Sequence, residues 1–150
     1  MSAGRFHILV VEDNEADVYL LRKAFEHAGL DTDLTVIDDG AEALAYVRGD
    51  GQHRYARRPH VALLDLNLPK NEGTDVLEAL RANANLSSIP VIVLTSSASP
   101  ADRLRLEHLR VDRFVTKPPD LEEFLKIGNL VSDLLLNAKS SRGIMNRATS

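Results

Sequence analysis

The sequence of 150 residues contains no cysteine. This absence excludes disulfide bonds, thiolate metal sites and cysteine nucleophiles, and it is compatible with a reducing compartment. No apolar run is long enough to cross a membrane, and the leader formed by residues 1–5 does not have the features of a signal peptide. We therefore expect a cytoplasmic protein with no membrane partner.

Neither sign of charge is in large excess. The formal net charge is −4, with 44% hydrophobic and 27% charged residues, as is typical of a globular chain. This balance gives no general attraction to nucleic acid or to an anionic membrane. The length suits one domain with a single sizeable core, and no internal repeat divides it. A ligand must therefore bind at a local site.

Five short runs predict the strands of a parallel sheet, and the first, third and fourth of them have the composition of strands that are buried on both faces. The five runs are Phe6–Val11, Leu34–Ile37, Val61–Leu64, Ile89–Leu94 and Arg113–Thr116. Each run is followed by a segment with helical spacing or helix-forming composition, the last of which begins after Asp120. This alternation predicts one doubly wound, flavodoxin-like α/β domain over residues 6–136, with five helices and right-handed crossovers. We expect the strand order 2-1-3-4-5.

The last predicted helix has more apolar residues than one sheet face needs. The face expected to cover the sheet consists of Leu121, Phe124, Leu125, Gly128, Val131 and Leu135. A neighbouring stripe of Ile127, Leu130 and Leu134 predicts either a protein contact, such as a homodimer through this helix, or packing under a nearby loop. Residues 137–150 form a polar, mildly basic tail that we expect to be mobile or ordered by a partner.

Charged and polar residues stand at the ends of four predicted strands. They are Glu12 and Asp13 after the first strand, Asp65 after the third, Thr95 at the fourth and Lys117 after the fifth. The carboxyl ends of parallel strands meet at one edge of the sheet, so we expect these side chains to share a cleft. Two carboxylates about 4 Å apart repel by about 4 kcal/mol when the effective dielectric is about 20. The cleft therefore needs positive charge.

Lys117 can supply one positive charge, and a hard divalent cation with oxygen ligands can supply the rest. Mg²⁺ fits this donor set best, whereas zinc and copper do not suit a chain without cysteine or clustered histidine. A carboxylate beside Mg²⁺, a hydroxyl and a lysine is suited to phosphoryl transfer. Each residue also has a structural interpretation, such as a helix-start charge or a loop cap. Their joint position at strand ends favours the functional one.

Four ordered motifs in this chain resemble those of the receiver domain of two-component response regulators. They are Ile8–Asn14, Leu63–Pro69, Val93–Ser97 and Phe114–Pro118. The resemblance extends over nearly the whole chain, from about Phe6 to Leu136. It implies that Asp65 is the phosphoacceptor, and that Glu12, Asp13, Asp65 and the backbone carbonyl of Asn67 hold Mg²⁺.

The resemblance also implies a switch. Thr95 would be the hydroxyl that moves toward the phosphoryl group, and Lys117 would form a salt bridge to it. The Lys117–Pro118 bond would be cis, as in the family. Phe114 fills the position of the switch aromatic, but its ring has no hydroxyl to donate. In place of the Gly-Ala pair of many receivers, this chain has Arg110-Val111.

The expected phosphoryl donor is a sensor histidine kinase. The loop Gly49–Pro59 is longer than in a minimal receiver, and this loop, Asp65–Lys70 and Leu121–Phe124 together resemble stand-alone regulators paired with phytochrome-like kinases. Four basic residues of the loop are expected either to be solvated or to contact an acidic partner: His53, Arg54, Arg57 and Arg58. No segment after Leu136 is long enough for a DNA-binding domain, so we expect no direct DNA binding.

Three other functions compete with that of a non-enzymatic, single-domain regulator. A haloacid-dehalogenase-like phosphatase also uses a strand-end aspartate and Mg²⁺, but it needs a second aspartate where Asn67 stands. A flavodoxin-like FMN binder needs a phosphate loop rich in Ser, Thr or Gly where this chain has Glu12–Glu15. A non-switching receiver scaffold is the third, although no acidic position is missing.

Overall fold

The computed structural model describes residues 5–54, 56–66, 73–96 and 99–149. The strands are β1 (Phe6–Val11), β2 (Thr32–Ile37), β3 (Val61–Leu64), β4 (Val91–Thr95) and β5 (Arg113–Thr116). The α-helices are α1 (Glu15–His27), α2 (Gly40–Arg48), α3 (Gly73–Ala82), α4 (Pro100–Leu106) and α5 (Leu121–Thr149). Two short 3-10 helices are η1 (Gly51–His53) and η2 (Glu107–Leu109).

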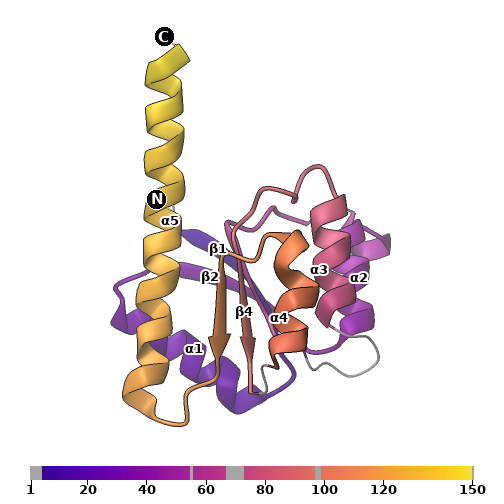
Figure 1. Cartoon of the computed structure of the whole chain (residues 1–150), viewed down its shortest axis with the longest axis vertical. Coiled ribbons are helices and arrows are strands. Elements are labelled where there is room, and N and C mark those ends of the chain that lie inside the picture. The colour runs from indigo at the N-terminus through magenta and orange to yellow at the C-terminus, as the bar shows by residue number, and fades with distance from the viewer. Residues whose placement is uncertain (1–4, 55, 67–72, 97–98, 150) are drawn as a thin grey trace.

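The five strands form one parallel sheet with the order β2-β1-β3-β4-β5, which confirms the predicted fold. Helices cover both faces of this sheet (Figure 1). Two strands begin at other residues than predicted, since β2 starts earlier, at Thr32, and β4 starts later, at Val91. Pro90 has no N–H to donate to a ladder, which explains the later start of β4.

Alternate residues of the central strands supply two apolar layers. On β1, Leu9 and Val11 belong to the layer that includes residues of α2, α3 and α4, whereas Ile8 and Val10 belong to the layer with α1 and α5. Burial on both faces is why these runs are apolar throughout rather than alternating with polar residues. The carboxyl ends of the strands are thereby held in register between two layers of helices.

Helices α1 and α5 approach each other closely at Gly128. A Cβ added there would lie 2.1 Å from the carbonyl oxygen of Ala24 and 3.2 Å from the Cβ of Ala28. The nearest obstacle is backbone, which cannot turn aside as a flexible side chain would. Only glycine fits, and the close approach fixes α1 against the layer that carries α5.

The apolar surface of α5 is arranged differently from the prediction. Ile127 and Leu134 of the supposed contact stripe are buried in the core of this chain, and Leu130 is partly buried against it. Leu121, assigned to the sheet face, is instead 56% exposed. The stripe packs within the domain because α1 and the sheet together cover a wider arc of α5 than the sheet alone.

Helix α5 does not end at Leu136 but continues to Thr149. In Figure 1 its carboxyl-terminal part extends past the edge of the sheet, away from the other elements. Leu136, where the helix leaves the domain, is 58% exposed. In the described part of the chain, no helix is long and apolar enough to cross a membrane.

The turn before β5 accommodates an arginine in a backbone conformation that favours glycine. Arg110 has a φ of 58°, in the left-handed region that favours glycine. Its carbonyl accepts a hydrogen bond from the Arg81 guanidinium at 2.7 Å, and its own guanidinium donates to the Ser87 carbonyl at 3.4 Å. The turn therefore keeps its tight form, and Arg81 helps to stabilise it.

A buried histidine joins β1 to β2. His7 is 5% exposed, and its Nε2 lies 2.7 Å from the Thr35 hydroxyl. Its backbone exchanges hydrogen bonds with His60, whose Nδ1 accepts from the His7 N–H at 2.9 Å and whose N–H donates to the His7 carbonyl at 2.7 Å. Burial lowers the pKa of His7 below its ordinary value, and the positive charge of Arg57 lowers it further.

We expect Gly128→Ala to destabilise the protein by about 1–3 kcal/mol, because the methyl group has no room beside the Ala24 carbonyl. Urea unfolding followed by circular dichroism measures the change. Asn129→Ala, at the adjacent exposed position of α5, is the control and should change stability little. Equal stability of the two variants would contradict this packing.

We expect the buried, neutral His7 to make stability depend on pH. Because its folded-state pKa is lowered, its contribution is fully present above the unfolded value of about 6.5 and is lost as pH falls through the folded pKa. Urea unfolding of wild type and His7→Val at pH 7.5 and 5.5 isolates this contribution. The stability advantage of wild type should shrink at the lower pH, and a constant difference would refute the assignment.

Candidate functional site

The predicted site residues meet at the carboxyl edge of the sheet. Glu12 follows β1 directly, Asp65 follows β3, and Lys117 follows β5. The parallel register aligns these ends, since Val11 pairs with Leu64 across β1 and β3. Residues far apart in the sequence are therefore neighbours, as the strand-end pattern predicted.

Three carboxylates face a common point. Glu12, Asp13 and Asp65 each offer one oxygen, and these oxygens lie within 4.8 Å of one another. Glu12 and Asp65 are buried, whereas Asp13 is exposed. Oxygen donors at this spacing suit a hard divalent cation, which would neutralise their repulsion and take further ligands from water.

Lys117 lies beside these carboxylates and is 12% exposed. Its Nζ is 2.7 Å from Glu12 Oε1 and 3.1 Å from Asp65 Oδ2. Its backbone N–H donates to the carbonyl of Thr95 at 2.7 Å, which fixes the start of the β5–α5 loop against β4. The ammonium group therefore reaches Asp65, at the end of β3, from the end of β5.

Lys117 also contacts a carboxylate that the sequence analysis missed. Its Nζ lies 2.8 Å from Oδ2 of Asp17 on the first turn of α1. An acidic residue there would ordinarily be explained by the helix dipole alone. The signal that could have found Asp17 is its place in the first turn of the helix that follows Glu12, which puts it near the same edge of the sheet.

The pKa values in the site reflect its excess of negative charge. Burial raises the pKa of Glu12 to about 7, and the charge of Asp65 raises it too, while a hydrogen bond from Lys117 lowers it. Burial by itself would lower the pKa of Lys117, but hydrogen bonds to Asp17 and Glu12 outweigh it and raise that pKa above its ordinary value. One lysine does not balance the acids around it, so the site has capacity for further positive charge.

Thr95 and Phe114 lie on the neighbouring strands β4 and β5. Thr95 is the last residue of β4 and is completely buried. Phe114 is partly buried against the layer that includes α3 and α4, and the Arg103 guanidinium of α4 lies 4.8 Å from the centre of its ring. This contact is a cation–π interaction between α4 and β5.

Close packing places Asp65 relative to α3. A Cβ added to Gly73, the first residue of α3, would lie 2.3 Å from the backbone oxygen of Asp65 and 2.7 Å from Cα of Leu66. The N–H of Gly73 donates to the Leu66 carbonyl at 3.0 Å. The start of α3 is therefore packed against the end of β3, and no larger residue fits without moving the Asp65 backbone.

Two predicted features of the site are not confirmed by the structure. The Lys117–Pro118 bond was predicted to be cis, but the described residues contain no cis peptide bond. Lys117 reaches Glu12 and Asp65 with a trans bond, which is the lower-energy form of a bond to proline. Asn67, the fourth predicted metal ligand, lies outside the described residues.

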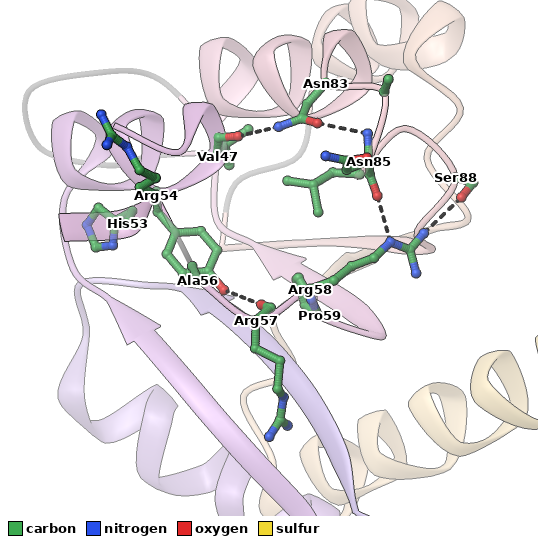
Figure 2. Close-up of a pocket in the computed structure, with 13 residues that line it drawn as sticks. Val47, His53, Arg54, Ala56, Arg57, Arg58, Pro59, Asn83, Asn85 and Ser88 are labelled. Atoms are coloured by element: carbon green, nitrogen blue, oxygen red, sulfur yellow. Dashed lines mark hydrogen bonds between the residues drawn. The ribbon is translucent and has the colours of Figure 1, made fainter. Parts of the chain in front are cut away.

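A polar pocket of about 480 Å³ lies at the opposite end of the sheet, beside the loop before β3. Its arginines do not converge on a common point (Figure 2). Arg57 extends away to Asp33 at 3.3 Å, and Arg58 donates to the Asn85 carbonyl at 2.6 Å and to the Ser88 hydroxyl at 3.0 Å. These bonds secure the loop to the domain, and the pocket shares no residue with the acidic site.

Fold and site together define a class of protein: a doubly wound α/β domain with an acidic site and a lysine at the carboxyl edge. The family model for the response regulator receiver domain matches residues 8–128. The chain therefore belongs to the response regulator receiver family. This assignment confirms the resemblance carried by the four motifs and leaves the phosphatase and FMN-binding alternatives without support.

Similar proteins agree with this assignment. Response regulator Rcp1 of Synechocystis sp. is 37% identical over 120 residues, which cover 80% of this chain and 82% of Rcp1. The structure of the phosphorylated cyanobacterial phytochrome response regulator RcpA has 34% identity and a TM-score of 0.81, covering 89% of this chain and 96% of RcpA. The structure of Mn²⁺-bound Rcp1 has 36% identity and a TM-score of 0.75, and the match covers 82% of this chain and 88% of the Rcp1 chain.

Proposed function

We propose that this protein is a single-domain response regulator that accepts a phosphoryl group on Asp65 from a sensor histidine kinase. The observation that carries the proposal is the convergence on Asp65 of two further acidic oxygens and the Lys117 ammonium. We propose Mg²⁺ as the cation, held by Glu12, Asp13, Asp65 and the backbone carbonyl of Asn67. When bound, Mg²⁺ would supply positive charge for the phosphoryl oxygens.

In the proposed reaction, a carboxylate oxygen of Asp65 attacks the phosphorus of the kinase phosphohistidine. A P–O bond forms, the P–N bond breaks, and the imidazole leaves with its electron pair. Lys117, 3.1 Å from Asp65, donates an N–H to one phosphoryl oxygen, and the Thr95 hydroxyl donates to another. Hydrolysis later returns the free carboxylate when a water oxygen attacks the phosphorus and the P–O bond to Asp65 breaks.

We propose that phosphorylation changes the surface formed by α4, β5 and α5. The phosphorylated Asp65 carries roughly −1.5 to −2 charges in place of one, and it adds acceptor oxygens, which draw Thr95 and Lys117 toward it. Movement of Thr95 at the end of β4 alters the space beside Phe114. The Arg103 guanidinium of α4 packs on the ring of Phe114, so α4 is affected as well. Because the Phe114 ring has no hydroxyl to form a hydrogen bond, only its packing contacts can change, and this change in packing alters which partners bind the surface.

The similarity to RcpA, a phytochrome response regulator by its description, supports a phytochrome-like kinase as the donor. We further propose that the protein acts in the cytoplasm through protein partners and without binding DNA. A scaffold that never switches is the competing proposal. The four-part arrangement of Glu12, Asp13, Asp65 and Lys117 favours phosphorylation, because a scaffold does not require these charges in one place.

We also propose a homodimer through α5, now on a different basis. Ile127 and Leu134 are buried within the domain and cannot form the contact. The remaining basis is the carboxyl-terminal part of α5, which extends beyond the sheet (Figure 1), together with the exposed Leu136. Unaccompanied helices of this kind are stabilised by packing against another surface.

We expect Asp65→Asn to abolish phosphorylation, because an amide oxygen is a far poorer nucleophile than a carboxylate. The measurement is Mg²⁺-dependent labelling by acetyl phosphate or by a radiolabelled kinase, with an acid-stability test of the product. Chelation of Mg²⁺ by EDTA should also prevent labelling of the wild type. Asp75→Asn, an exposed acid on α3, is the matched control and should be labelled normally. Undiminished labelling of Asp65→Asn would refute the assignment.

We expect the dimer to depend on the extension of α5. Light scattering at tens of micromolar, with and without beryllofluoride as a phosphoryl mimic, should give a dimer for the full chain. A variant truncated after Asn137 should be monomeric and keep its circular dichroism apart from the lost helical turns. A monomeric full chain under both conditions would remove this proposal without affecting phosphorylation.

A further inference from the structure

Asp17 contributes to the site without belonging to its cation-binding group. The carboxylates whose oxygens could share a cation are Glu12, Asp13 and Asp65 among the described residues. Asp17 Oδ2 instead lies 2.8 Å from Nζ of Lys117, and the Asp17 side chain is 17% exposed. Its position is fixed from the backbone as well, because the Asn14 side chain caps α1 by accepting the Asp17 N–H at 3.1 Å.

The ammonium group of Lys117 has three N–H donors and three carboxylate neighbours: Glu12, Asp17 and Asp65. Two of these neighbours have another task in the proposed function. Glu12 would turn to the cation, and Asp65 would carry the phosphoryl group. Asp17 is the neighbour that would remain available to Lys117 throughout.

We propose that Asp17 is a positioning residue that holds the Lys117 ammonium beside Asp65 when the site is loaded. This inference rests on the proposed function and assigns separate roles to the acids of the site. Glu12, Asp13 and Asp65 bind the cation, and Asp17 binds the lysine. The lysine stem is flexible, so an anchor on α1 reduces the conformational freedom that Lys117 loses when it contacts a phosphoryl oxygen.

The anchor is rigid because of how α1 is held. The Asn14 cap fixes the first turn of the helix, and the close approach of Gly128 to Ala24 fixes α1 against α5. Asp17 lies on α1 and Lys117 lies just before α5, and these two helices pack in the same layer. The distance between them is therefore set by packing on one side of the sheet.

The test compares binding of two probes, Mg²⁺ alone and beryllofluoride at saturating Mg²⁺, by isothermal titration calorimetry on the full chain. Asp17→Asn should weaken beryllofluoride binding about tenfold, as expected for the loss of one charge-assisted hydrogen bond. Glu15→Gln is the matched control, because it removes the same charge from the same turn at an exposed position. Both variants should bind Mg²⁺ with similar affinity, and Asp17→Glu should recover part of the beryllofluoride affinity.

A double-mutant cycle separates positioning from general electrostatics. In the Lys117→Ala background, Asp17→Asn should cause no further loss of beryllofluoride binding, since the residue acts through Lys117. An equal loss in both backgrounds, or an equal effect of Asp17→Asn and Glu15→Gln, would overturn the inference. Circular dichroism and urea unfolding establish that each variant is folded, and Asp17→Ala replaces Asp17→Asn if the latter is not.

The two proposals fail in different ways. If wild type does not bind beryllofluoride, or Asp65→Asn binds it as well as wild type does, the proposed function itself fails. If wild type binds and Asp65→Asn does not, while Asp17→Asn behaves as Glu15→Gln, only the positioning role of Asp17 fails.

Discussion

The structure depends on the attraction between one partly buried ammonium group and the carboxylates gathered around it. Lys117 lies within 3.1 Å of an oxygen on each of Glu12, Asp17 and Asp65, which come from three separate segments. At short distances and low exposure, such charges interact more strongly than on the surface. Lys117 thus links the ends of β1, β3 and β5, and the acids keep the excess negative charge that attracts a cation.

The sheet makes this charge arrangement possible. Parallel strands place their carboxyl ends at one edge, and apolar layers on both faces fix the strands relative to one another. Two glycines set the distances at which the surrounding elements pack, Gly73 between α3 and Asp65 and Gly128 between α5 and α1. The site can hold several charges in fixed positions because the scaffold around it is apolar and tightly packed.

Much of this arrangement could be predicted from sequence. The apolar runs identified all five strands, and the residues after them identified Glu12, Asp65, Thr95 and Lys117. The prediction was weaker where a residue's role depends on its orientation about a helix. For Ile127 and Leu134 the sequence left open a partner contact or packing under a loop; both pack within the domain, because spacing along α5 does not reveal how wide an arc α1 and the sheet cover together.

By itself, the sequence determined the alternation of strands and helices, the burial of β1, β3 and β4 on both faces, and the chemical character of the strand ends. These follow from local patterns of apolar and charged residues. The tertiary structure decided that Asp17 bonds to Lys117, that Arg110 adopts a left-handed turn, and that the arginines beside the polar pocket point apart. Such contacts join residues distant in the chain, and their geometry is set by packing of whole elements, which local sequence patterns do not encode.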